Sequence, residues 1–193
     1  MRLPKLTSEE MSPRQREISD RIAGRRGGTR GPFLCWLHSP ELADRVEALG
    51  AYARFESSLE LCLRELILLI AARHFDAQYS WNAHIDRCVA EGVSATALAE
   101  LARNKTPRFD DRDQQLIYEF CTELLNEHFV RDETFERARA AFGNHGCVDI
   151  VGTLGNYSML AMCLNVFEVD LQPDRQPPFP EIRGYARVAP SVN

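Results

Sequence analysis

The sequence lacks the concentrated positive charge that defines most nucleic-acid-binding proteins. Its 193 residues carry a net charge of -5. The only basic cluster is short and consists of Arg25, Arg26 and Arg30. Proteins that bind nucleic acids need a basic face to neutralise phosphates. We therefore expect no nucleic-acid partner.

The six cysteines lack the spacing of a metal site or of a disulfide-exchange motif. They stand at positions 35, 62, 88, 121, 147 and 163, and none belongs to a CxxC pair. None is spaced with a histidine as zinc ligands usually are. The N-terminal segment also lacks the apolar core of a signal peptide. We therefore predict free thiols in a reducing, cytoplasmic environment, and no metal site.

Membrane-spanning runs and strand patterns are scarce as well. The most apolar stretch, residues 150 to 167, contains Thr153, Asn156, Asn165 and two glycines, and no basic anchors flank it. We interpret it as a buried helix and expect no membrane partner. Alternating β-branched residues are missing, and apolar spacing is helical nearly everywhere. With 45% hydrophobic residues, the sequence predicts one all-α domain over residues 1 to 170.

Capping signals divide this domain into helices, because a capping residue precedes a proline or an apolar periodic stretch in several places. The expected helices cover about 13–24, 40–55, 58–74, 79–91, a short stretch after 94, a stretch from 110 or 111, 132–143 and 147–168. In the second helix Leu42, Val46 and Leu49 should face inward. In the last one Gly152 and Gly155 should let a neighbouring helix approach. From 171 to 193, five prolines predict an extended arm that lies across a surface or a neighbouring subunit.

Two polar residues stand on helical faces that are otherwise apolar. Glu65 begins a run, LILLIAA, whose residues occupy the whole circumference of the third helix. A carboxyl group buried there would have a raised pKa unless a partner compensates. His84 shares a stripe with Trp81, Ile85 and Cys88 of the fourth helix. If these two helices form a hairpin, Glu65 and His84 can meet across the seam.

Each of these residues also has a purely structural interpretation. Glu65 could form a buried salt bridge with an arginine, and His84 could be a core group with satisfied hydrogen bonds. Tyr79 and Trp81 could be ordinary packing aromatics. Residues 25 to 31, RRGGTRG, could be a solvated connection rather than part of a carboxylate-binding site.

A motif in this region resembles a known family. The stretch ELILLIAAR, residues 65 to 73, is followed by YSWNAH, residues 79 to 84, and then by AEG. This pattern resembles the signature of the carboxymuconolactone decarboxylase family, which belongs with the alkylhydroperoxidase D-like proteins. GPF before SPEL and NYSMLAMCLNVF near the C-terminus extend the resemblance over about 30 to 170. It implies an alkylhydroperoxidase D-like helical fold that assembles as a homo-oligomer, a trimer, hexamer or dimer.

The motif departs from the hydroperoxidase branch at two positions. In that branch a glutamate, a CxxC pair and a histidine form a proton relay that activates a thiol. Glu65 and His84 match the glutamate and the histidine, but Ala77 and Ser80 stand where the cysteines would be. Disulfide exchange requires a thiolate and a resolving thiol. The resemblance therefore favours the decarboxylase branch, whose members process a small carboxylated lactone without a cofactor or metal.

The decarboxylase resemblance implies an enzyme, carboxy-lyase-like or otherwise a proton-transfer catalyst, that acts on a small carboxylated lactone or keto acid. His84 would donate a proton to carbon, Glu65 would orient and tune it, and Tyr79 would offer a hydrogen bond. The residues assigned to substrate binding are Arg30 for the carboxylate, and Trp81, Phe33, Trp36 and Tyr157 as further pocket residues.

Two other functions stay open at this point. One is a thiol redox or antioxidant protein of the alkylhydroperoxidase kind, which would use Cys62 or Cys88 beside Glu65 and His84. The other is a non-catalytic oligomeric binding protein, in which the two inward polar groups only stabilise the helix hairpin.

Overall fold

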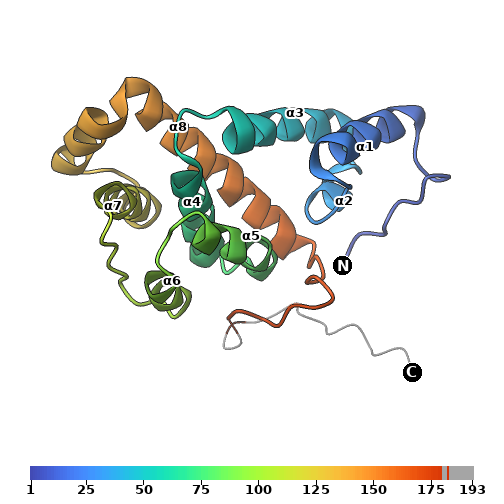
Figure 1. Ribbon diagram of the computed structural model, residues 1–193. Coiled ribbons are helices and arrows are strands. Elements are labelled where there is room, and N and C mark those ends of the chain that lie inside the picture. Colours follow the sequence, from blue (N-terminus) through green and yellow to red (C-terminus); the bar gives the residue numbers. More distant parts are fainter. Residues whose placement is uncertain (180–181, 183–193) are drawn as a thin grey trace.

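The computed structural model describes residues 1–179 and 182, and these residues form helices and connecting loops without any strand (Figure 1). The all-α prediction is confirmed. In chain order the helices are α1 (Pro13–Arg26), α2 (Phe33–Trp36), α3 (Pro40–Ala51), the π-helix η1 (Tyr52–Glu56), α4 (Leu61–His74), α5 (Gln78–Ala90), α6 (Ala95–Ala102), α7 (Arg112–Glu127) and α8 (Asp132–Val166).

Helix α4 is the centre of the structure. It packs against α5, α7 and α8, and every residue from Glu65 to Arg73 is buried. Helices α1 to α3 lie toward one end of the structure and α6 and α7 toward the other (Figure 1). Because apolar residues surround its axis, α4 can pack on all sides. The prediction that this helix is buried all round is confirmed.

Three predicted helix starts coincide with observed side-chain caps. At α1 the Ser12 side chain accepts a hydrogen bond from the Gln15 amide, and the Gln15 side chain accepts one from the Ser12 amide, which completes a capping box. Ser94 caps α6, and Asp111 accepts hydrogen bonds from two amides of α7. These side chains satisfy backbone donors that the first helical turn leaves without partners.

Three elements differ from the prediction. The four-residue helix α2 was not expected, and η1 gives the end of the second predicted helix a π-helical conformation. Between residues 132 and 166, the two predicted helices form the single element α8. Its only non-helical residue is Gly143, with φ 67° and ψ 178°. This conformation favours glycine because φ is positive, so the predicted stop remains visible as a kink.

The predicted inner face of α3 is wrong at two positions. Leu42 and Leu49 are each 42% exposed, whereas Val46 and Glu47 are buried. Helix α3 turns Glu47 toward α1, where arginines approach its carboxylate. This electrostatic preference cannot be read from apolar spacing.

Gly152 and Gly155 also have no neighbouring element within contact distance in the described residues.

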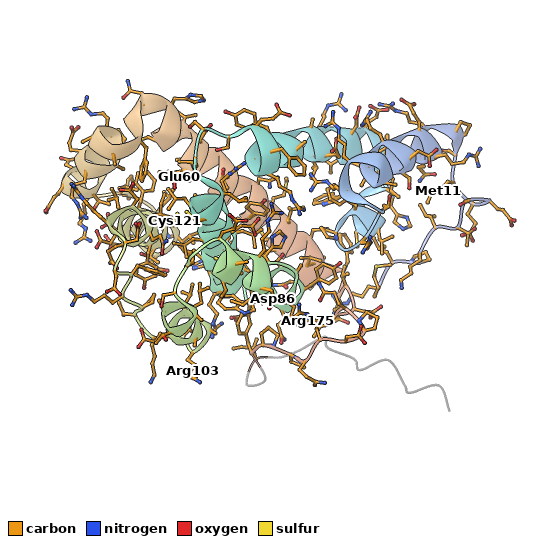
Figure 2. All side chains as sticks on the ribbon, viewed as in Figure 1. Met11, Glu60, Asp86, Arg103, Cys121 and Arg175 are labelled. Atoms are coloured by element: carbon orange, nitrogen blue, oxygen red, sulfur yellow. The ribbon has the colours of Figure 1, made fainter. Side chains whose placement is uncertain are left out.

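The described part of the C-terminal arm runs along α5. Asn82 donates a hydrogen bond to the Gln176 carbonyl at 2.9 Å, and Arg175 pairs with Asp86 (Figure 2). Phe179 is fully buried and packs in the core. The rest of the predicted arm lies outside the described residues.

Helix α8 also bears on the membrane prediction. Among the described helices it is the one long and apolar enough to span a bilayer, and 56% of its most apolar window is buried inside the protein. Core helices of globular proteins have the same length and hydropathy.

Candidate active site

The α4–α5 hairpin brings together the two polar residues that the sequence places on apolar faces. A three-residue turn joins the helices, so they run antiparallel and pack along their length. His84 Nδ1 lies 2.7 Å from Glu65 Oε2. Because an ionised carboxylate only accepts hydrogen bonds, Nδ1 donates and Nε2 remains for a ligand.

The Glu65 carboxylate is held in its ionised form. Its side chain is only 2% exposed, and burial alone would raise its pKa. The hydrogen bond from His84, together with the charges of His84, Arg87 and Arg54, outweighs burial and holds the pKa of Glu65 below its usual value. Arg87 Nε lies 3.4 Å from Oε1. The compensating partner that the sequence analysis required is therefore present.

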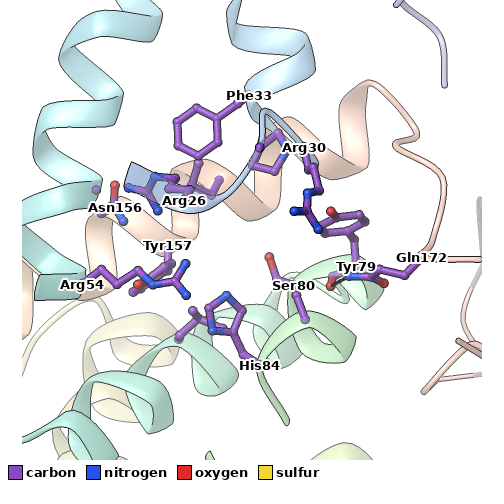
Figure 3. Close-up of a pocket in the computed structure, with 16 residues that line it drawn as sticks. Arg26, Arg30, Phe33, Arg54, Tyr79, Ser80, His84, Asn156, Tyr157 and Gln172 are labelled. Atoms are coloured by element: carbon purple, nitrogen blue, oxygen red, sulfur yellow. Dashed lines mark hydrogen bonds between the residues drawn. The ribbon is translucent and has the colours of Figure 1, made fainter. Parts of the chain in front are cut away.

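His84 faces a cavity of about 360 Å³ (Figure 3). This volume lies within the range of small-ligand sites, toward its lower end. The wall is assembled from several elements: His84, Tyr79, Ser80 and Ala83 of α5, Leu68 of α4, Asn156, Tyr157 and Leu160 of α8, Arg26 of α1, Gly28, Arg30 and Pro32 of the loop, Phe33 of α2, Gly50 of α3, Arg54 of η1, and Gln172 of the arm.

Most of the residues predicted for the site surround this cavity. Glu65 reaches it through His84. The residues that line it directly are His84, Tyr79, Arg30, Phe33 and Tyr157. They come from four separate segments of the chain, which only the tertiary fold brings together.

The two predicted tryptophans do not line the cavity. Trp81 is buried in the main core, with its ring edge-on to Phe179 at a centroid distance of 5.2 Å. Trp36 packs against two smaller clusters, one formed by residues of α1 to α3 and one in which Cys35 meets the C-terminal end of α8. Trp81 shares the buried side of α5 with His84, but that side is wide enough to face both the core and the cavity. Helical spacing does not distinguish these two directions.

Arg30 lines the cavity mouth but is engaged by its own loop. Its Nη2 donates to the Gly27 carbonyl at 2.6 Å. The next residue, Gly31, has φ 60°, and a Cβ at this position would lie 2.7 Å from the ring of Tyr79. Only glycine lets the loop approach Tyr79 this closely. The loop therefore packs directly on the aromatic wall of the site.

Three residues that were not predicted for the site also line the cavity: Arg26, Arg54 and Asn156 (Figure 3). Arg26 ends α1, and Arg54 lies in η1, a conformation often found at functional sites. Asn156 is a buried polar residue in the apolar helix α8. It carries the same sequence signal as Glu65, a polar residue on an apolar face. No comparable signal marks the two arginines.

The two tyrosines of the cavity are neutral hydrogen-bond donors at ordinary pH. Burial, with a smaller effect of Glu65, raises the pKa of Tyr157 to about 12. Burial also raises the pKa of Tyr79, against a weaker opposing effect of Arg30. The ring centroids of His84 and Tyr157 are 6.3 Å apart. Both phenols can therefore donate to a ligand oxygen that gains negative charge in the cavity.

The thiols nearest to the dyad in sequence are poorly placed for redox chemistry. Cys88 is fully buried, and burial, followed by the charge of Glu65, raises the pKa of its thiol well above the usual range. Burial and Glu60 raise the pKa of Cys62. No cysteine lines the cavity among the described residues. Nor do these residues contain a group of three or more side chains arranged to hold a metal.

Comparison with known proteins agrees with the motif. Residues 40–113 match the model of the carboxymuconolactone decarboxylase family. The matching segment contains both Glu65 and His84, so the predicted resemblance is confirmed where the dyad lies. A search among curated proteins finds no match.

Solved structures show the same fold over most of the chain. One is described as an alkylhydroperoxidase AhpD core, an uncharacterized peroxidase-related protein from Ralstonia eutropha JMP134. It is 18% identical to this chain, with a TM-score of 0.70, and the alignment covers 86% of this chain and 88% of that one. Another, an uncharacterized peroxidase-related protein from Silicibacter sp. TM1040, is 15% identical, covers 88% and 89%, and has a TM-score of 0.69. The predicted alkylhydroperoxidase D-like fold is confirmed.

Proposed function

We propose that this protein is a cofactor-independent acid–base enzyme of the carboxymuconolactone decarboxylase type, acting on a small carboxylated lactone or keto acid. The observation that carries the proposal is the Glu65–His84 pair, joined at 2.7 Å, at the wall of a cavity of about 360 Å³. A carboxylate that fixes one nitrogen of an imidazole while the other faces a ligand is the usual arrangement of a general acid–base histidine.

His84 would act by protonating carbon. When the substrate loses carbon dioxide, the electron pair of the broken C–C bond moves into the conjugated carbonyl and forms an enolate. His84 in its doubly protonated form then transfers the Nε2 proton to carbon, the carbonyl is restored, and the neutral ring keeps the Nδ1 proton toward Glu65 until solvent returns a proton to Nε2. Glu65 acts through His84, because the hydrogen bond that it accepts from Nδ1 fixes the orientation of the ring.

The tyrosines would stabilise the enolate oxygen. Tyr79 and Tyr157 keep their protons because burial raises the pKa of each phenol. A fixed neutral donor strengthens its hydrogen bond as negative charge develops on the acceptor, and this lowers the barrier. The tyrosines therefore supply the electrostatic part of the proposed reaction, and His84 supplies the proton.

The residues at the motif positions support acid–base chemistry over thiol chemistry. Ser80 lines the cavity at the position of one motif cysteine, and Ala77, at the other, is buried. A hydroxyl and a methyl group cannot form or exchange a disulfide. The peroxidase-related description of the two solved structures applies to those proteins, which are 18% and 15% identical to this chain.

The test is a screen of small lactones and keto acids for substrate consumption and carbon dioxide release. The wild-type protein should consume a member of this panel, and His84→Ala and Glu65→Gln should each lose turnover while keeping helical content. Cys62→Ser and Cys88→Ser should stay active. If the serine variants lose activity and the dyad variants keep it, the redox alternative replaces this proposal. If no variant changes an activity that the wild type shows, the dyad is structural.

We also propose that the protein is a cytoplasmic homo-oligomer. Support comes from apolar residues exposed on one side of α8, at the helical spacing of a packed face: Val148, Val151, Met162 and Val166. A second copy of the chain would cover them. Sedimentation should show an assembly that Val151→Asp weakens; a monomeric wild-type protein would contradict the proposal.

A further inference from the structure

The part of the cavity lining that comes from α1, η1 and α8 contains buried polar atoms without hydrogen-bond partners. We call Arg26, Arg54 and Asn156 the arginine wall. Asn156 is 1% exposed, and both polar atoms of its side chain amide lack a hydrogen-bond partner. The same holds for Arg26 Nε and Nη2 and for Arg54 Nε. Native proteins rarely leave such groups unpaired unless they serve a function.

The fold holds these groups in place. The Arg26 guanidinium lies over the ring of Phe33, 4.9 Å from its centroid. Gly50 provides the space beside it, because a Cβ at that position would lie 3.2 Å from Arg26 Nη2 and 3.6 Å from Asn156 Oδ1. The π-helix η1 places Arg54 in the same wall. The donors are therefore positioned before any ligand arrives, which lowers the entropic cost of binding.

This part of the molecule has more positive than negative charge. The carboxylate nearest to Arg26 is that of Glu47, whose Oε1 lies 3.9 Å from Arg26 Nε. Glu47 is shared with Arg21 at 3.9 Å and Arg25 at 3.5 Å. Burial, and then the charge of Arg54, lowers the pKa of Arg26. A guanidinium group whose charge is disfavoured by burial and by a second arginine is stabilised when an anion binds beside it.

We infer that Arg26, Arg54 and Asn156 form the carboxylate-binding subsite of this cavity, and that the carboxylate they bind is one that the reaction retains. The inference rests on the proposed function and deepens it. A carboxylate that leaves as carbon dioxide loses its charge in the transition state. Cations fixed on it would stabilise the substrate more than the transition state and would slow the reaction. The group that the two arginines bind is therefore a carboxylate that stays ionised throughout the reaction and anchors the substrate.

This assignment replaces Arg30 as the main carboxylate ligand. Arg30 Nη2 is engaged by the Gly27 carbonyl, whereas the unpaired nitrogens belong to Arg26 and Arg54. The substrate class that follows is a small organic acid with a permanent carboxylate on one side and the reacting carbon on the side of His84.

The test measures binding without chemistry. Levulinate, a keto acid with one carboxylate, is titrated by calorimetry against the wild-type protein, and its uncharged methyl ester is the ligand control. Arg26→Gln and Arg54→Gln should each weaken levulinate binding by about tenfold or more. Arg30→Gln, the matched variant at the cavity mouth, should weaken levulinate binding less than either of these two variants. If Arg30→Gln causes the largest loss, or the wild type binds ester and acid equally, the inference is wrong.

A second variant guards against loss of folding. Asn156→Asp keeps the size of the side chain and places a carboxylate beside Arg26 and Arg54. It should abolish levulinate binding and leave the thermal midpoint unchanged or raised, because the new charge pairs with the guanidinium groups. Unchanged affinity in this variant would overturn the inference.

The outcomes separate this inference from the proposed function. If Arg54→Gln loses levulinate binding but His84→Ala retains full turnover on a confirmed substrate, the anion site stands and the acid–base role fails. If the dyad variants lose turnover but the arginine variants bind levulinate normally, the acid–base role stands and the anion site fails.

Discussion

The two walls of the cavity differ in how their polar groups are satisfied. On the α4–α5 wall, the buried carboxylate of Glu65 is matched by His84 and Arg87 at 2.7 and 3.4 Å. On the arginine wall, guanidinium and amide groups have buried atoms without hydrogen-bond partners, and the ion pair of Arg26 with Glu47 is long, at 3.9 Å. A hydrogen-bonded pair fixes the position of a proton, whereas donors without hydrogen-bond partners can bind an anion. We therefore assign the chemistry to the α4–α5 wall, which we call the chemical wall, and binding to the arginine wall.

The strongest test of this division is His84→Ala. Removing a general acid typically costs about 10² to 10⁴ in rate, so kcat on a confirmed substrate should fall by this factor while KM changes little. His145→Ala is the control, because that side chain is 71% exposed. Steady-state kinetics of both variants decides the matter. If kcat falls equally in both variants, or in neither, the assignment of the chemistry to the α4–α5 wall is wrong.

The loop between the walls should be sensitive at Gly31. In Gly31→Ala, the new methyl group would clash with the ring of Tyr79 at 2.7 Å, in a backbone conformation with φ 60°. We expect a loss of about 2–3 kcal/mol in the free energy of unfolding. Gly27→Ala separates the two causes, because its φ is 71° but its Cβ would meet only Arg30 Nη2, at 3.9 Å. That control should lose about 1 kcal/mol. If denaturant melts show that Gly31→Ala and Gly27→Ala lose the same free energy of unfolding, the clash with Tyr79 is excluded as a cause.

Arg54→Gln should show the opposite kinetic signature to His84→Ala. If the arginine wall binds a carboxylate equally in the substrate and the transition state, KM should rise by about tenfold while kcat stays within a small factor. Initial rates over a range of substrate concentrations measure this split. A variant with normal KM and lowered kcat would move Arg54 to the chemical wall.

The smallest expected effect is the pH dependence of stability at Glu65. Its pKa is lowered in the folded protein, so the carboxylate contributes stability above its unfolded pKa, and that contribution is lost as pH falls through the folded pKa. The stability difference between wild type and Glu65→Gln should be largest near neutral pH, on the order of 1 kcal/mol. Below about pH 4 it should shrink. Urea melts at several pH values test this; a difference that grows on acidification would contradict the sign.

The two walls also differ in how well the sequence predicts them. Glu65 could be identified because α4 is apolar around its whole circumference, so any polar residue there is buried. A three-residue turn then limits which residues of α5 it can reach. Arg26 and Arg54 lie near helix ends, where a long side chain can point to solvent or inward. The π-helical turn that carries Arg54 also interrupts the periodicity on which the prediction depends.

The same physics explains the errors elsewhere. Leu42 and Leu49 have the spacing of an inner face, but α3 instead turns Glu47 toward the arginines of α1. Trp81 shares the buried side of α5 with His84, yet it packs in the core. Periodicity shows which residues are buried; it does not show what they face.

The central claim is that His84 delivers a proton to carbon. It is tested most directly by turning over the first confirmed substrate in D₂O and following the product by proton NMR. The wild type should place deuterium at the carbon that loses carbon dioxide, and His84→Ala should do so at least about 10² times more slowly. Deuterium incorporation at the wild-type rate in His84→Ala would contradict the account.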